Sequence, residues 1–162
     1  MRTSRFDSEV EKTICKANHE SAVKKIEIMK CKNPVDESRR YVENAKKVLR
    51  ENGDLDVKTQ LYQDEKYVRA AGHYLWLAVL LMLDAVFHVR TDRRTRVDIN
   101  AYLDAVRKRD RKLLGLVNSS YDIMHLYMGY DGVQRKAVCD DGVTLANDII
   151  DRCALMLAEH QS

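Results

Sequence analysis

The stretch AAGHYLWLAVLLMLDAVFHV, residues 70–89, decides the fold of this chain. Its apolar side chains cover almost every face of a helix, so we expect it to make contacts on more than one side. Its unbroken apolar part, residues 74–83, would rise about 15 Å as a helix, half of a bilayer core of about 30 Å. The stretch therefore predicts a buried central helix, or one with a face in a subunit interface, and no membrane span.

Segments on both sides of this stretch show the 3–4 spacing of amphipathic helices. No segment keeps the alternation of a half-buried strand, and one proline with six glycines is too few for the turns of an all-β sandwich. These features predict an all-α, up-and-down bundle of five to six helices. We expect helices within residues 1–32, from Pro34 to about residue 51, from residue 64, and beginning near Asp98, after Asp110 and after Gly132, with residues 53–63 as a polar connection and Gly129 as a C-terminal cap.

Length and composition predict one domain. The chain has 162 residues, which suits a single helical bundle with an N-terminal helix over residues 1–32 and a core over residues 33–160. With 45% hydrophobic residues, and 28 basic residues against 25 acidic ones, the chain is not of the disordered class. The four cysteines include no CxxC pair, so we expect no metal site, and we expect no cofactor. The N-terminus has no apolar stretch of the kind that a signal peptide requires, which predicts a cytoplasmic protein with reduced thiols.

The highest charge lies in residues 90–112, with nine basic and four acidic residues, a local net of +5. Because the whole chain carries +3, the remainder carries −2. Such a patch is typical of a partner rich in phosphate, such as RNA, although interleaved aspartates also fit a solvated linker laced with ion pairs. The candidate nucleic-acid-binding residues are Arg90, Arg93, Arg94, Arg96, Arg107, Lys108, Arg109 and Arg111.

Asp84 interrupts the apolar stretch and needs a partner, because an unpaired buried carboxylate costs several kcal/mol. His88 follows at i+4, and His73 precedes Asp84 by three helical turns on nearly the same face. The three residues predict a buried polar seam that fixes the helix register, or else a catalytic acid/base row. A third hypothesis is a small-molecule pocket where His73, Asp84 and His125 converge.

The stretch SSYDIMHLYMGYDG, residues 119–132, is the most specific cluster. Tyr121 and His125 lie four residues apart and should share one helix face, while Tyr127 should project from a different side. The alternative interpretation is that Tyr121 belongs to the core and that His125 is a satisfied polar residue at its edge.

His125 and Tyr127, followed by an aspartate and glycine turn, resemble the signature of HEPN domains. These are small helical bundles of prokaryotic toxin and defence systems, and many are metal-independent ribonucleases that act as homodimers. Some are paired with minimal nucleotidyltransferases. The resemblance implies a homodimer, a nucleotidyltransferase as protein partner, and His125 and Tyr127 as catalytic residues if the protein is active.

The chain departs from the HEPN motif at its arginine, since the corresponding positions hold Asn118, Ser119 and Ser120. In that family the arginine stabilises charge on the phosphate while the histidine manages protons. Either Arg69 or Arg111 would have to supply the charge of the missing arginine, or the protein has no catalytic activity. We favour the absence of catalysis. From Asn33 onward the chain also resembles a small bacterial family of undefined function.

We therefore expect a HEPN-like, dimeric module of the toxin–antitoxin type that binds RNA or nucleotide through residues 90–112 and is not an enzyme. The competing hypothesis is a structural or protein-interaction module without nucleic-acid affinity, whose apolar central helix forms an interface.

Overall fold

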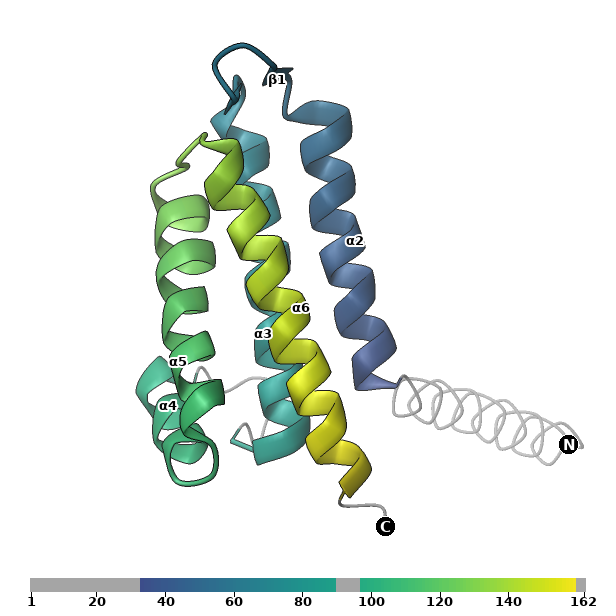
Figure 1. The fold of residues 1–162 in the computed structure, drawn as a ribbon, viewed down its shortest axis with the longest axis vertical. Helices are drawn as coiled ribbons and strands as arrows, with labels where there is room; N and C mark the ends of the chain where they lie inside the picture. The colour runs from purple at the N-terminus through teal and green to yellow at the C-terminus, as the bar shows by residue number, and fades with distance from the viewer. Residues whose placement is uncertain (1–32, 90–96, 160–162) are drawn as a thin grey trace, which may run out of the picture. The chain divides into compact units, whose positions relative to one another are not determined.

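The computed structural model describes residues 33–89 and 97–159. Apart from Asn33, these residues lie in the compact unit Pro34–Ser162. The long helical segments of this unit, which are α2, α3, α5 with its continuation η1, and α6, alternate in direction (Figure 1). This confirms the predicted all-α, up-and-down bundle. The elements are α2 (Pro34–Asn52), β1 (Leu55–Asp56), β2 (Leu61–Tyr62), α3 (Glu65–Phe87), α4 (Ile99–Arg107), α5 (Arg111–Ser120), the π-helix η1 (Tyr121–Tyr130) that continues α5, and α6 (Lys136–Glu159).

The predicted N-terminal helix over residues 1–32 lies outside the described residues. A single domain over residues 1–162 therefore stays a prediction.

Three helices begin at an aspartate. The carboxylates of Asp64, Asp98 and Asp110 accept hydrogen bonds from backbone N–H groups in the first turns of α3, α4 and α5, at 2.9–3.2 Å. An aspartate at this position satisfies donors that have no partner within the helix. The helix starts are therefore set by local sequence.

Residues 53–63, predicted as a polar connection, form a small antiparallel hairpin of β1 and β2. The hairpin is joined to the start of α6, since the Tyr62 N–H donates to the Gln134 carbonyl at 2.9 Å and the Lys136 N–H to the Gln60 carbonyl at 3.0 Å. Strands of two residues are too short to show alternation, so sequence patterns did not reveal them.

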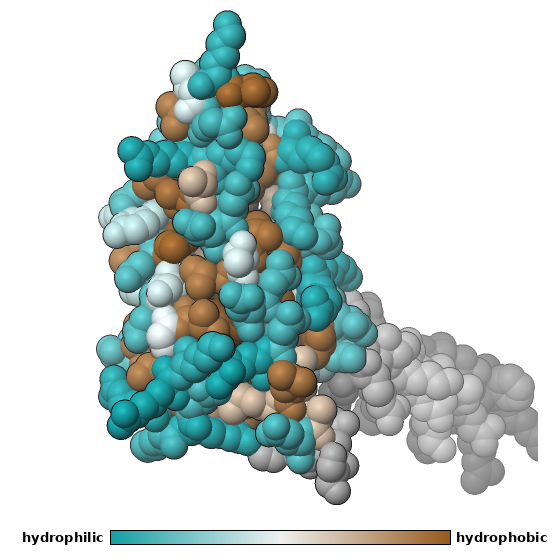
Figure 2. All heavy atoms as spheres, in the orientation of Figure 1, coloured by the Kyte–Doolittle hydropathy of each residue, from teal (hydrophilic) through white to brown (hydrophobic). Residues whose placement is uncertain are grey.

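The helix α3 packs against α2, η1 and α6, and ten of its 23 residues are buried. By length and composition it is the one helix of the described ranges that could cross a membrane, but half of its apolar window is buried inside the bundle. The prediction of a buried central helix is confirmed. Figure 2 shows the face formed by α6 and its neighbours, where hydrophilic side chains surround small hydrophobic groups.

The backbones of α3 and η1 approach very closely at Gly72. A Cβ atom there would lie 2.7 Å from the Met124 carbonyl oxygen, the Gly129 nitrogen and the Met128 Cβ. The prediction that Gly129 caps the helix is wrong, because Gly129 is buried inside η1 and the left-handed glycine is Gly132, with φ +67°. The backbone nitrogen of Gly129 is one of the atoms that pack against Gly72.

We expect Gly72→Ala to lower the free energy of unfolding by about 1–3 kcal/mol, because the new methyl group overpacks against backbone atoms that cannot yield. The matched control is Gly115→Ala in α5, where nothing lies within 4 Å of the new Cβ. It should raise stability by about 0.5–1 kcal/mol, since alanine favours a helix more than glycine does. Urea unfolding measures both; equal effects would contradict the close approach.

Candidate functional site

The rings of Trp76, Tyr121 and His125 form a cluster between α3 and η1. The centroid of the His125 ring lies 5.1 Å from that of Tyr121 and 5.7 Å from that of Trp76, and Trp76 meets Tyr121 edge-on at 5.6 Å. The prediction that Tyr121 and His125 share one helix face is confirmed. Both are half-buried, so their rings stay accessible from one side.

This cluster forms one wall of an open pocket of about 480 Å³, a volume within the ordinary range for small-molecule sites. The other walls come from α3 and from the start of α4. The lining residues are Trp76, Leu80, Val97, Asp98, Ile99, Tyr102, Tyr121 and His125.

Tyr102 attaches α4 to α3 at the pocket. Its hydroxyl donates to Asp84 Oδ1 at 2.7 Å, and the Tyr102 side chain is buried. The predicted need of Asp84 for a partner is thus met by a tyrosine of another helix. At the pocket edge, the Asp98 carboxylate accepts from the backbone and side chain of Asn100, at 3.2 and 3.1 Å.

The prediction of a buried polar seam is wrong, because His73 and His88 are exposed and Asp84 is only half-buried. Asp84 contacts α4 through Tyr102, and His73 lies beside Gly129 of η1, so these residues stand at the edges of packed elements and not inside the core. The pocket is lined by His125 but by neither His73 nor Asp84, so the three side chains do not converge on it.

Tyr127 lies outside the pocket. Its side chain is 48% exposed, and it projects from a different side of η1 than Tyr121 does, as predicted. Of the two residues that match the HEPN signature, only His125 therefore lines the pocket.

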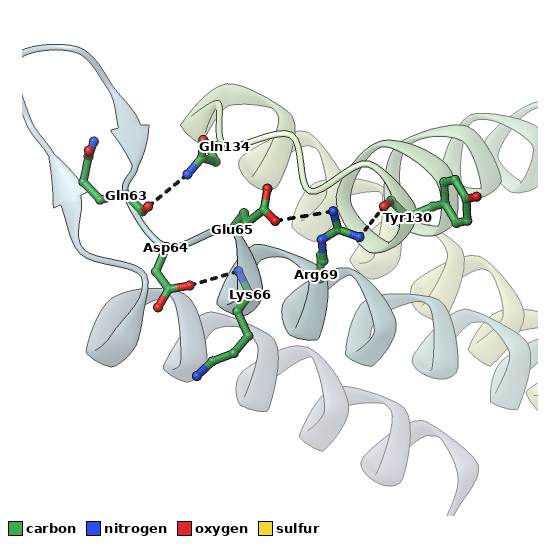
Figure 3. Close-up of polar contacts among 7 residues, drawn as sticks. All are labelled: Gln63, Asp64, Glu65, Lys66, Arg69, Tyr130 and Gln134. Atoms are coloured by element: carbon green, nitrogen blue, oxygen red, sulfur yellow. Dashed lines mark hydrogen bonds and ion pairs between the residues drawn. The ribbon is translucent and has the colours of Figure 1, made fainter.

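Arg69 holds the end of η1. Its guanidinium donates to the Tyr130 carbonyl at 2.6 Å and pairs with Glu65 at 3.5 Å, while the Tyr130 ring points away (Figure 3). Arg111 is exposed at the start of α5, ten residues before Tyr121 and so about 15 Å along the helix. Neither arginine lines the pocket, so neither replaces the missing motif arginine there.

The described part of the basic segment lies at the turn between α4 and α5, where Arg107, Lys108, Arg109 and Arg111 are exposed. Arg107 pairs with Asp104 at 2.8 Å, and the Arg109 guanidinium lies 5.9 Å from the Phe87 ring centroid. This turn is at the opposite end of α4 from the pocket. The remaining candidates, Arg90, Arg93, Arg94 and Arg96, lie outside the described residues.

Sequence reasoning missed Trp76 and Tyr102 as site residues, because both lie in apolar patterns typical of core. The only signal was that Trp76 is the single tryptophan of the chain.

The buried cysteines of α6 are not nucleophiles. Burial raises the pKa of Cys139 and of Cys153 to about 12, so both thiols keep their protons at neutral pH. Within residues 33–89 and 97–159, no group of three or more His, Cys, Asp or Glu side chains is placed to hold a metal ion.

Asp110 connects the basic turn to α6, since Arg152 Nε donates to its Oδ2 at 2.6 Å. This hydrogen bond, reinforced by two backbone N–H donors, lowers the pKa of Asp110. A lowered pKa in the folded state stabilises the fold above the ordinary aspartate pKa, and the contribution is lost as the pH falls through the folded value.

We expect Asp110→Asn to lower stability at pH 7 and to flatten its decline below about pH 4, because asparagine keeps the cap but cannot carry the charge. The control is Asp104→Asn, whose ion pair with Arg107 is more than 60% exposed and contributes little. Urea unfolding at several pH values compares them. Identical profiles for the two variants would refute this role of Asp110.

Comparisons with known proteins place the chain among proteins without a described function. Residues 33–154 match a family model described as "Domain of unknown function (DUF5618)". A solved structure described as a protein of unknown function from Dyadobacter fermentans shares 38% sequence identity, with a TM-score of 0.67 over 74% of this chain and 93% of that chain. A search of curated proteins found no match.

Proposed function

The chain belongs to the DUF5618 family, and we propose that it is a HEPN-like module that binds single-stranded RNA or nucleotide in the pocket beside His125. The observation that carries this proposal is the cluster of Trp76, Tyr121 and His125 rings on the wall of an open pocket. Unpaired bases bind proteins by stacking on such rings.

The pocket can also hydrogen-bond a base. The Asp98 carboxylate accepts hydrogen bonds, and of the two His125 ring nitrogens only Nε2 can face a base, because Nδ1 is buried. The basic turn, with Arg107, Lys108 and Arg111, lies about 13 Å along α4 from Asp98 and about 15 Å along α5 from Tyr121. A strand of several nucleotides would place one base in the pocket and its phosphates on the basic turn.

The proposed activity is binding without cleavage. Attack of a 2′-hydroxyl on phosphate develops negative charge, which needs a positive group at the reacting atoms. Among the described residues that line the pocket, none is lysine or arginine. His125 could move a proton, but none of the described residues that line the pocket would stabilise the charge on the phosphate.

Fluorescence anisotropy with a labelled single-stranded RNA at low salt tests the proposal. Tyr121→Ala should weaken binding roughly tenfold, because one stacked base contributes about 1–3 kcal/mol. The matched control is Tyr130→Ala, since Tyr130 is 75% exposed and lies outside the pocket. It should bind as the native protein does.

The labelled RNA should stay intact on a denaturing gel, with the native chain and with His125→Ala alike. Cleavage that depends on His125 would overturn the non-enzymatic part. Absence of binding, or equal effects of the two tyrosine variants, would overturn the RNA part.

We also propose that the chain forms a homodimer through the exposed face of α3, here called the α3 seam. Its residues are all exposed or half-buried, and they follow the 4-3 spacing of a helix-packing seam: Ala70, Tyr74, Leu77, Leu81, Asp84 and His88. Leu77 at its centre is 47% exposed, which is unusual on an otherwise well-buried helix.

Charge favours a second copy as the partner. Lys66 and His73 lie beside the first half of the α3 seam, and Asp84 lies in its second half. A two-fold, antiparallel pairing would bring His73 of one protomer near the partner's Asp84 at both ends of the interface.

Leu77→Lys should convert the dimer to a monomer, because the interface would bury an unpaired charge. Leu155→Lys is the control, since Leu155 is 67% exposed on α6. Light scattering after size-exclusion chromatography measures the mass. A monomeric native chain, or a dimer that survives Leu77→Lys, would contradict the proposed interface and favour a different protein partner on this face.

A further inference from the structure

A second cavity, of about 530 Å³, is lined by residues of the last turns of α2, the hairpin and the first turns of α6. These elements meet at the hairpin end of the bundle (Figure 1). None of the residues lining it lines the pocket beside His125. The proposed RNA binding makes no use of it.

The floor of this cavity is apolar and preformed. Leu49 and Tyr62 are buried, at 5% and 7% exposed, and Leu55 and Val143 beside them are half-buried. The hairpin residue Tyr62 is held in place by the backbone hydrogen bonds that join β2 to the start of α6. A ligand would therefore meet a surface that needs no rearrangement.

The rim of the cavity is cationic, with Lys46, Arg50 and Lys136 against one carboxylate, Asp140. Lys136 pairs with Asp140, and Lys46 pairs at 2.7 Å with Glu43, which does not line the cavity. The contact of Arg50 with Glu51 is 3.8 Å, too long for a hydrogen bond, so the guanidinium fork can turn towards an anion.

The first turn of α6 adds to this positive potential, because Lys136 stands at the N-terminal end of a 24-residue helix. The hydrogen bond with Asp140 raises the pKa of Lys136, so its ammonium group stays charged. Of the three cations, Arg50 is the one whose contact with a carboxylate is longer than a hydrogen bond, so it is best placed to bind an anion.

We propose that this cavity binds a small amphipathic anion, with an aromatic or branched apolar body and one acidic group. The body would lie on Leu49, Tyr62 and Val143, and the acidic group would take a bidentate hydrogen bond from Arg50, with Lys46 nearby. The floor is only a few side chains wide, which suits a ring-sized body better than a long acyl chain.

Two fluorescent probes with nearly the same aromatic body test the proposal. Anilinonaphthalene sulfonate carries an anionic group, and phenylnaphthylamine lacks it. We expect the sulfonate to bind the native full-length chain about tenfold more tightly than the neutral probe, since a charge-assisted hydrogen bond contributes at that level.

Arg50→Gln should weaken the sulfonate about tenfold and leave the neutral probe unchanged. The control is Arg40→Gln, whose arginine is exposed on the same helix, pairs with Glu37 and lies outside the cavity. Equal affinity of the two probes, or equal effects of the two arginine variants, would overturn the proposal.

Thr144→Trp places a bulky ring at an exposed position on the cavity wall and should reduce binding of both probes. Tyr121→Ala, in the pocket beside His125, should leave sulfonate binding unchanged. If Tyr121→Ala weakened sulfonate binding and Thr144→Trp did not, the probe would bind in the pocket beside His125, and the second site would be refuted. RNA binding is measured separately, so failure here leaves the proposed function standing.

Discussion

The rest of the bundle depends on the close passage of two backbones at Gly72, where a Cβ would lie 2.7 Å from backbone atoms of η1. One turn further along α3, Trp76 meets the rings of Tyr121 and His125. About one turn earlier, Arg69 reaches the carbonyl of Tyr130 at the end of η1. The aromatic pocket and the end of the π-helix are thus positioned by residues spaced along α3 on either side of one glycine.

Long-range polar contacts fix the shorter elements around this crossing. Tyr102 hydrogen-bonds Asp84 across 18 residues of sequence, and Arg152 hydrogen-bonds Asp110 across 42. The first attaches α4 to α3, and the second attaches the start of α5 to α6. The apolar pocket wall and the basic turn lie at opposite ends of α4. In the proposed function, base stacking and phosphate contacts therefore take place at separate sites.

How far the sequence predicted the site depends on the range of each contact. The shared face of Tyr121 and His125 follows from their four-residue spacing and was predicted correctly. The seam of His73, Asp84 and His88 was predicted with the same logic, yet its histidines are exposed. Periodicity shows which residues share a face, but not whether another element covers that face. The hairpin escaped prediction because its two-residue strands are too short to show alternation, and its bridge to Arg135 is not local.

By itself, the sequence determined the helical class, the aspartates that begin α3, α4 and α5, and the apolar character of α3, because these depend on neighbours within a turn or two. Only the tertiary structure decided that Trp76 joins His125, that Tyr102 is the partner of Asp84 and that Arg69 binds a backbone carbonyl. The contacts of Trp76 and Arg69 depend on which residues of α3 and η1 face each other, and the close approach at Gly72 sets that register. The contact of Tyr102 depends on the packing of α4 against α3. No local pattern encodes either.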